Sequence, residues 1–442
     1  MEAAFAPPRL HMRERPGNAA GAKVCPRGPE RGRVSDGKSR LNVVNSLASL
    51  RHFRFPLASA ATALLSALAV GCGQDAPVAP TSGIPEIQPG LAYTNHHLPQ
   101  GPWSVHVVRI PRSGPGIALR ALHADNRAFG LATISSQVRG IPAASGVALA
   151  AVNGDFYQRE RTFAGDPRGL QILDGELLSA PKGVCLWTSP DGTPHVDEVI
   201  ARFTVAWPDG TISPLGLHEE PEPDRLVLFT SAAGPSTRTS GGREWKLIPE
   251  EGGGALRPIL PAVNRKARVE SVRDGGDSPI PERGMVLSAG RALARRLPTV
   301  EPGAVLTLDF ATSVPIDGAV TGIGGGPVLV RGGKAVRIEV PDDDAYQFKS
   351  MRERHPRSAV GWNAEHLFLV TSDGRREGAA GMTLEELGAF LASLGCTDAM
   401  NLDGGGSATL WAGGAIRNQP SDGSERPIAN ALAIVRQAGR AP

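Results

Sequence analysis

The sequence has little of what a membrane-spanning or disulfide-rich protein needs. No apolar run reaches the length of a transmembrane helix, and only 4 of the 442 residues are cysteine. No spacing of cysteine and histidine resembles a zinc site, so we predict no metal and no other cofactor. Aromatic residues make up 5% of the chain, whereas Gly (54) and Pro (38) are abundant. This composition indicates short strands joined by many turns.

The charge of the chain is unevenly distributed. The formal net charge is +3, but residues 1–72 contain 11 Lys and Arg against 4 Asp and Glu. Subtracting these from totals of 47 and 44 leaves 36 against 40, a net charge of −4 for the rest of the chain. A mildly acidic remainder without a basic stripe argues against nucleic acid as a partner.

The basic amino-terminal segment resembles an export signal. Arg51 and Arg54 precede an apolar stretch at residues 55–70, and the small residues that follow end at Cys72. A charged segment, an apolar core and a small-residue cleavage site form a signal peptide, and a cysteine in this place is typical of a bacterial lipobox. We predict a signal peptide at residues 51–72 and lipidation of Cys72. The protein would then be a periplasmic or cell-surface lipoprotein of a bacterium, held at the membrane by that lipid; the alternative is a buried apolar helix.

Residues 1–50 and 73–90 do not have the composition of a folded domain. The first segment is rich in Arg, Gly and Pro and lacks hydrophobic periodicity, so it is predicted to be disordered or to precede the true translation start. The second segment contains four prolines and is predicted to be an extended linker. The folded domain is therefore predicted at residues 91–442.

A carboxylate beside three glycines stands out in the carboxyl-terminal part of the chain. Asp403 is followed by Gly404, Gly405 and Gly406, with apolar residues on both sides. Three consecutive glycines carry a high entropy cost, so they predict a close approach of the backbone to something that is not protein. The amides of these glycines and of Ser407 are predicted to form a nest for phosphate or another anion. The alternative is a tight turn between two strands.

Four other segments have a similar polar, glycine-rich character. They are AVNGDFY at 151–157, IGGGPVLV at 323–330, RHPRSAVG at 354–361 and SDGSERPIANAL at 421–432. Together with the glycine loop, they resemble the phosphodiester glycosidase family in order along the chain. The resemblance implies a hydrolase that releases a sugar from a phosphodiester. The sequence departs from the family at Asp155, where a second glycine is usual.

Hydrophobic periodicity predicts an α+β fold of mixed β-sheets with a few helices, and the resemblance implies the fold of the phosphodiester glycosidases. The clearest helix is at residues 383–394, because Thr383 caps it and Glu386 completes a capping box. Asp174-Gly175 between two strand-like runs predicts a two-residue hairpin. Short strand-like runs alternate with turns from about residue 190 to about residue 320, which predicts a β-rich insertion.

The chemistry implied by the resemblance selects the catalytic candidates. Hydrolysis at the anomeric carbon needs an activated water and stabilisation of an oxocarbenium-like centre, and carboxylates meet both needs. Asp403 is the predicted base or nucleophile; the alternative is a turn cap. Arg357 is predicted to grip two phosphate oxygens, the alternative being a surface ion pair. Asn153 would hold a sugar hydroxyl or orient Asp403, and Asp155 is either a second site carboxylate or a turn cap.

Six further residues are predicted to bind substrate. His355 is either a proton carrier or an exposed loop histidine, and Asp373 has the sequence context of a hairpin turn, although the resemblance keeps it near the site. Glu425 and Arg426 are predicted either to pair in support of the site or to form a surface salt bridge. The last two are Gly324 and Gly325 of the second glycine triplet.

The leading hypothesis is an exported enzyme that hydrolyses a glycosyl phosphodiester in cell-envelope or extracellular polysaccharide metabolism. The alternatives are a non-catalytic lipoprotein that binds glycan or phosphate, and a metal-dependent phosphodiesterase that cuts the P–O bond. Cys185 and Cys396 would form a disulfide or remain as small buried hydrophobic residues.

Overall fold

The structure is a computed structural model that describes residues 86–437, except 115, 161 and 341–345. The predictions for residues 1–50, the signal peptide and Cys72 fall outside the described residues. The end of the predicted linker is described, and it forms the short strand β1 (Glu86–Gln88). No helix in the described part of the chain is long and apolar enough to cross a membrane.

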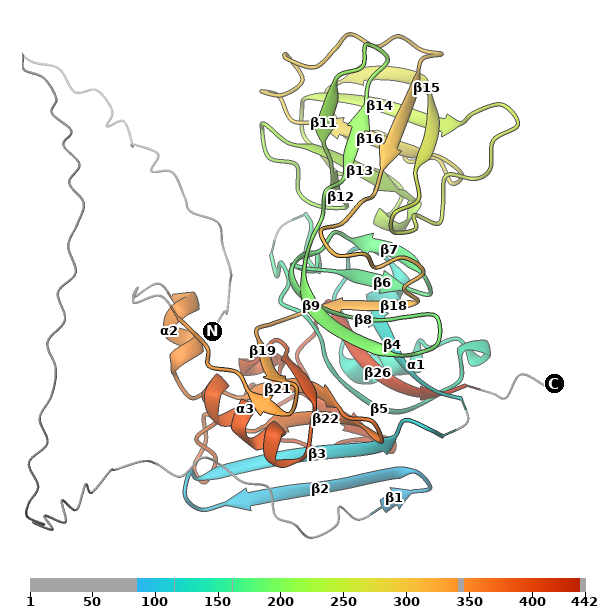
Figure 1. Cartoon of the computed structure of the whole chain (residues 1–442). Coiled ribbons are helices and arrows are strands. Elements are labelled where there is room, and N and C mark those ends of the chain that lie inside the picture. The colour runs from blue at the N-terminus through green and yellow to red at the C-terminus, as the bar shows by residue number, and fades with distance from the viewer. Residues whose placement is uncertain (1–85, 115, 161, 341–345, 438–442) are drawn as a thin grey trace, which may run out of the picture. The chain divides into compact units, whose positions relative to one another are not determined.

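Two sheets that pack against each other carry most of the motif residues (Figure 1). Buried aliphatic side chains of both, such as Val108, Leu369, Val152 and Leu432, share one cluster, so burial of apolar surface holds the layers together. In hydrogen-bonded order, the larger sheet contains β1, β2 (Leu91–Leu98), β3 (Trp103–Pro111), β22 (His366–Ser372), β21 (Arg357–Trp362), β23 (Asp398–Asn401), β19 (Val328–Arg331) and β20 (Lys334–Ala335). The smaller contains β25 (Ala415–Ile416), β24 (Leu410–Ala412), β5 (Val147–Asn153), β26 (Asn430–Arg436) and β4 (Ile117–His123).

Two further sheets are formed mainly by the middle of the chain. Trp245 and Phe310 share an apolar cluster with Leu170 and Ile172, so one core serves both sheets. The five-stranded sheet contains β7 (Glu176–Ser179), β6 (Gln171–Leu173), β18 (Thr321–Gly324), β8 (Lys182–Thr188) and β9 (Pro194–Ile200). The eight-stranded sheet contains β11 (Ile212–Pro214), β10 (Thr204–Ala206), β17 (Val305–Asp309), β15 (Arg265–Asp274), β14 (Arg243–Pro249), β16 (Met285–Ala289), β13 (Leu226–Thr230) and β12 (Gly216–Leu217).

Strand directions make the fold mixed, as predicted. The pair β12 and β13 is parallel, whereas pairs such as β2–β3 and β26–β4 are antiparallel. The consecutive strands β3 and β4 belong to different sheets.

The helices are short, and the best predicted one is confirmed. In α3 (Leu384–Ser393), Thr383 and Glu386 form the predicted capping box, and Gly395 follows with a φ of +85°. Leu387 and Leu391 bury the apolar stripe of α3 against the eight-stranded sheet of β3 and β21 (Figure 1). The other two helices described are α1 (Ile134–Arg139) and α2 (Tyr346–Arg352).

The predicted hairpin is also present. Asp174 and Gly175 join β6 to β7, and both have positive φ values, +51° and +84°. Two consecutive positive φ angles are what a two-residue hairpin turn of this hand requires. The cysteines of the described residues are free and buried, so Cys185 and Cys396 do not form a disulfide.

Candidate functional site

Asp403 is held by the segment that ends β5. The Asp403 amide donates to the Gly154 carbonyl at 2.9 Å, and the Asp403 carbonyl accepts from the Asn153 Nδ2 at 2.6 Å. Asp403 thus follows β23 while its peptide groups are fixed by residues about 250 positions earlier in the chain. Its carboxyl group is buried, with 6% of the residue exposed.

Asn153, which holds the Asp403 carbonyl, is itself fully buried. Its Oδ1 accepts from the Ser358 hydroxyl at 2.6 Å and from the Thr409 amide at 3.1 Å. Of the two predicted roles, the geometry favours orientation of Asp403, because the side chain is completely buried and its oxygen already has two donors.

Two buried carboxyl groups have strongly perturbed titration. Burial raises the pKa of Asp403 to about 6, although the Ser407 hydroxyl and the charge of Arg426 act in the opposite direction. Burial raises the pKa of Asp155 to about 7, against the amides of Gly169 and Phe156, and the charge of Asp403 raises it further. The two carboxyl groups therefore interact electrostatically, and each resists ionisation because burial removes it from water.

Asp155 is packed tightly by two glycine-bearing segments. Its Oδ2 accepts from the Gly169 amide at 2.6 Å and its Oδ1 from the Phe156 amide at 2.8 Å. A Cβ on Gly324 would overlap the same carboxylate, and a Cβ on Gly325 would lie 2.6 Å from the Asn401 carbonyl oxygen. Gly324 and Gly325, predicted to bind substrate, thus allow a close approach to other parts of this protein.

The glycine loop uses most of its amides internally. The Gly404 amide donates to Asp403 Oδ1 at 2.9 Å, the Gly405 amide to the Pro356 carbonyl at 2.9 Å, and the Ser407 amide to the Gly404 carbonyl at 3.2 Å. Among the described residues, only the Gly406 amide of these four has no acceptor. The predicted nest is therefore reduced to a single available amide in this conformation.

Arg357 does not present a free fork to a ligand. Its Nε donates to the Met382 carbonyl at 3.0 Å, and its Nη2 donates to the carbonyls of Ser350 at 2.6 Å and Glu353 at 2.8 Å. These last two carbonyls lie at the end of α2, where a cation is favourable. The guanidinium is buried, so its role in this conformation is to fix the end of α2 and the backbone at Met382.

Asp373, one of the residues predicted to bind substrate, has partners within the protein. Asp373 is 1% exposed, and its carboxylate accepts from His106 Nε2 at 2.9 Å, Arg376 Nη2 at 2.7 Å and the Gln419 amide at 2.9 Å. Burial would raise the pKa of Asp373, but the hydrogen bond and charge of His106 together with Arg376 lower it to about 2. Asp373 is thus an ionised buried anchor and is not directed at solvent.

The predicted pairing of Glu425 with Arg426 is wrong. Glu425 accepts from the amide and the hydroxyl of Ser135 at 2.9 and 2.6 Å, so it caps the first turn of α1. Arg426 instead pairs with Asp422 at 2.7 Å. The pairing failed because adjacent residues on an extended segment point in opposite directions.

His355 lies beside a second arginine that the sequence did not single out. Arg375 Nη2 donates to His355 Nδ1 at 3.3 Å. Burial lowers the pKa of His355, and the charges of Arg357 and Arg375 lower it further. The imidazole is therefore neutral near pH 7, which suits an acceptor for Arg375 better than a proton carrier.

Several groups of the site were missed from the sequence. Tyr157 donates to the Pro427 carbonyl at 3.0 Å and also hydrogen-bonds Ser407, whose hydroxyl contacts Asp403. Burial raises the pKa of Asp166 well above its usual range, and the charges of Glu219 and Asp155 raise it further. Tyr157 belongs to the AVNGDFY segment, and this position could have indicated that it lies at the site. No sequence signal indicated Asp166, because a Gly-Asp-Pro triplet is typical of an ordinary turn.

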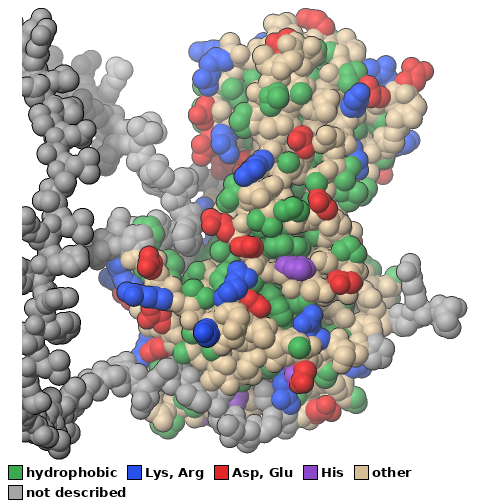
Figure 2. All heavy atoms as spheres, viewed as in Figure 1, with side chains coloured by type: hydrophobic (Ala, Val, Ile, Leu, Met, Phe, Trp, Pro, Cys, Tyr) green, Lys and Arg blue, Asp and Glu red, His purple; other side chains and the backbone are tan. Residues whose placement is uncertain are grey.

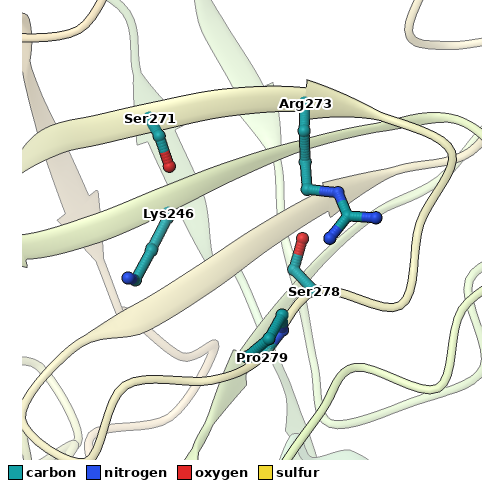
Figure 3. A pocket seen from close by; sticks show the side chains of 5 residues that line it. All are labelled: Lys246, Ser271, Arg273, Ser278 and Pro279. Atoms are coloured by element: carbon teal, nitrogen blue, oxygen red, sulfur yellow. The ribbon is translucent and has the colours of Figure 1, made fainter.

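A surface hollow elsewhere does not offer comparable chemistry. It lies on the eight-stranded sheet that contains β14 and β15. It is lined by Lys246, Ser271, Arg273, Ser278 and Pro279 (Figure 3). These residues include two cations but no carboxyl group, so the hollow lacks the acid–base groups found around Asp403. On the face shown in Figure 2, basic and acidic side chains are interspersed. Among the described residues, no group of three or more His, Cys, Asp or Glu is arranged to hold a metal ion.

Comparison with known sequences supports the predicted family. Residues 260–435 match the family model described as phosphodiester glycosidase, which confirms the resemblance over that part of the chain. A segment of 108 residues is 32% identical to mouse N-acetylglucosamine-1-phosphodiester alpha-N-acetylglucosaminidase, covering 24% of this chain and 21% of the mouse protein. A segment of 82 residues is 38% identical to YomE, a prophage-derived protein of Bacillus subtilis (strain 168), covering 18% of this chain and 13% of that protein. The matches thus span about a fifth or less of these relatives.

Solved structures share the fold over a larger part of the chain. A hypothetical protein from Synechocystis superposes with a TM-score of 0.63 and 22% identity, covering 79% of this chain and 63% of that one. An exported-protein candidate from Burkholderia pseudomallei K96243 superposes with a TM-score of 0.58 and 23% identity, covering 76% of this chain and 74% of that one. At these identities, the likeness concerns the fold, and it agrees with the predicted α+β class.

Proposed function

Because residues 260–435 match the phosphodiester glycosidase family, we propose that this protein hydrolyses a glycosyl phosphodiester at the anomeric carbon. The products are a free sugar and a phosphate monoester. The observation that carries the proposal is the pair of buried, electrostatically coupled carboxyl groups of Asp403 and Asp155, beside the glycine loop. Burial of a carboxyl group costs free energy and raises its pKa, and carboxyl groups with such raised pKa values are typical of active sites.

The proposed reaction transfers the sugar to water. The oxygen of a water molecule bonds to the anomeric carbon while the bond from that carbon to the phosphate oxygen breaks, and the electron pair leaves with the phosphate. Asp403, with the lower of the two pKa values, accepts the proton of the water in its ionised form. Asp155, the second buried carboxyl group, stabilises positive charge at the oxocarbenium-like carbon when it is ionised.

This assignment predicts how the rate depends on pH. Asp403 must be deprotonated to act as a base, and Asp155 must be ionised to stabilise the positive charge. The value of kcat/KM should therefore rise as pH increases through about 6 and further through about 7, the pKa values of these two carboxyl groups. Phosphate itself is a good leaving group, and therefore no strong general acid is required.

Replacement of Asp403 tests the proposal most directly. Asp403→Asn keeps the shape of the side chain and should reduce kcat by at least about a hundredfold. Asp398→Asn, on the strand that leads into the loop, is the matched control and should keep its activity. Cooperative thermal unfolding of both variants shows that each remains folded. Full activity of folded Asp403→Asn would refute the assignment.

Hydrolysis in water enriched in oxygen-18 separates the proposal from its alternatives. Cleavage at the anomeric carbon places the label in the sugar, whereas a phosphodiesterase that cuts the P–O bond places it in the phosphate. A non-catalytic lipoprotein would bind glycan or phosphate and release no product from a panel of sugar-1-phosphodiesters, with or without Asp403.

We also propose that the protein is exported and attached to a bacterial membrane through a lipid on Cys72. The support is the charged, apolar and small-residue order of residues 51–72. A cell-envelope or extracellular polysaccharide that contains sugar phosphodiesters would then be the accessible substrate. Fractionation of cells that express the full chain, before and after treatment with detergent, tests this location.

A further inference from the structure

Arg375 lies directly over the glycine loop. A Cβ on Gly405 would be 3.1 Å from its Nη2, and the backbone of both residues is left-handed, with φ values of +61°. Arg375 is exposed, and Nη2 donates to His355. Among the described residues, no acceptor pairs with its Nη1 or Nε. Unlike the guanidinium of Arg357, this one retains donors for a ligand.

Arg426 approaches the next residue of the loop. A Cβ on Gly406 would overlap its Nη2, so only glycine admits the guanidinium here. Asp422 fixes this group through Nε at 2.8 Å and Nη2 at 2.7 Å, while Nη1 is directed to the Ser407 hydroxyl at 3.5 Å. Two guanidinium groups therefore flank Gly405 and Gly406, whose remaining available amide is that of Gly406.

The turn that carries Arg375 is anchored by a buried carboxylate. The neighbouring Arg376 donates to the buried carboxylate of Asp373, which His106 and the Gln419 amide also hold. Tyr93 Oη lies 2.9 Å from His106 Nδ1 and extends the chain of hydrogen bonds. A carboxylate with this many donors restricts the turn, so the backbone position of Arg375 is fixed before any ligand arrives.

The charge of the leaving group explains why two cations are useful at this place. A phosphodiester carries one negative charge, whereas a phosphate monoester carries close to two above its second pKa of about 6. Cleavage of the bond to the anomeric carbon therefore creates negative charge on the phosphate. Donors that meet this new charge bind the transition state more tightly than the substrate.

We propose that Arg375 and Arg426 form a clamp for the phosphate that leaves as a monoester dianion, and that Asp373 is a positioning residue which holds Arg375 in place. The inference rests on the proposed hydrolysis at the anomeric carbon. It assigns the clamp to residues other than Arg357, which is bound to carbonyl groups.

Binding of simple phosphates to the full-length protein tests the clamp without turnover. At pH 8, methyl phosphate is a dianion and dimethyl phosphate a monoanion, so they mimic the product and the substrate charge. Arg375→Ala should weaken binding of methyl phosphate by about tenfold to a hundredfold, with a smaller effect on dimethyl phosphate. Arg296→Ala removes the same charge from an exposed position on the insertion and serves as the control.

A double-mutant cycle tests the role of Asp373. Asp373→Asn should weaken methyl phosphate binding in the wild-type background but have little further effect once Arg375 is alanine, because it acts through Arg375. A merely structural role would weaken binding equally in both backgrounds. Thermal unfolding of each variant shows whether the protein remains folded.

The outcomes separate this inference from the proposed function. Methyl phosphate binding that is absent, or unchanged in Arg375→Ala, overturns the clamp even if the protein hydrolyses glycosyl phosphodiesters. Binding that depends on Arg375 in a protein without hydrolase activity supports an anion site and refutes the proposed reaction instead.

Discussion

Substitution of Asp155 by asparagine should change how the stability of the protein depends on pH. Burial raises the pKa of this carboxyl group from 3.8 to about 7 in the folded protein. Between these two values, the folded state binds more protons than the unfolded state. The wild type therefore loses stability as pH rises through this window. Asparagine does not titrate, so the variant lacks this loss.

The size of the effect follows from the same two pKa values. Integrating proton uptake for a shift from 3.8 to about 7 gives a cost to the wild type of about 4 kcal/mol at pH 8 and about 2 kcal/mol at pH 5. The amide side chain offers one acceptor where the carboxylate accepts from both Gly169 and Phe156, which costs the variant about 2 kcal/mol at every pH. We expect near parity at pH 5 and a variant more stable by about 2 kcal/mol at pH 8.

Urea unfolding of both proteins at several pH values measures this difference. Asp224→Asn, in an exposed loop, controls for the general effect of removing a carboxylate. The reasoning is refuted if the stability difference between wild type and Asp155→Asn stays constant within about 0.5 kcal/mol from pH 5 to pH 8. The variant should also lose activity, because asparagine carries no negative charge to stabilise the oxocarbenium-like carbon. Asp155 would then be a residue that lowers stability but is needed for activity.

Three further substitutions test other parts of the structure. Arg357→Ala removes one donor from each of three backbone carbonyls, of which that of Met382 keeps the His355 amide, and should lower stability by about 2–4 kcal/mol. An unchanged melting temperature with lost activity would instead indicate that Arg357 binds the substrate. Gly405→Ala places a methyl group in a left-handed backbone next to Arg375, so specific activity should fall at least about tenfold while stability falls by about 1 kcal/mol. If activity per folded molecule stayed constant, the loop would be an ordinary turn. Cys72→Ala should abolish palmitate labelling, and persistent labelling would contradict a lipid anchor at that residue.

Features governed by neighbouring residues could be predicted from the sequence. The capping box of α3 depends on Thr383 and Glu386, three positions apart, and the turn at Asp174 depends on two adjacent residues. Both are short-range rules with a direct physical basis. The existence of strands in the middle of the chain was equally accessible, because alternation and turn residues are local signals.

The partners of the site residues could not be predicted in the same way. Arg357 was a reasonable candidate for a phosphate ligand, but its acceptors come from α2 and from Met382, 25 residues further along the chain. Glu425 caps α1 by bonding Ser135, which precedes it by 290 residues. No periodicity encodes such pairings, since they arise only when the sheets pack. The orientation of Asp403 by Asn153 was among the predicted alternatives, because the family resemblance brought these segments together.

The three glycines of the loop illustrate how a correct signal led to an incomplete mechanism. Each glycine is needed for a different close approach: the Pro356 carbonyl at Gly404, Arg375 at Gly405 and Arg426 at Gly406. The sequence predicted a close approach to something that is not protein, whereas the groups that approach the three glycines in the structure belong to the protein itself. The amides, however, are largely satisfied within the protein. Positive charge near the loop therefore comes from side chains that the missing Cβ atoms admit, and a guanidinium can release its hydrogen bonds to a ligand at lower cost than a backbone amide that already holds the loop together.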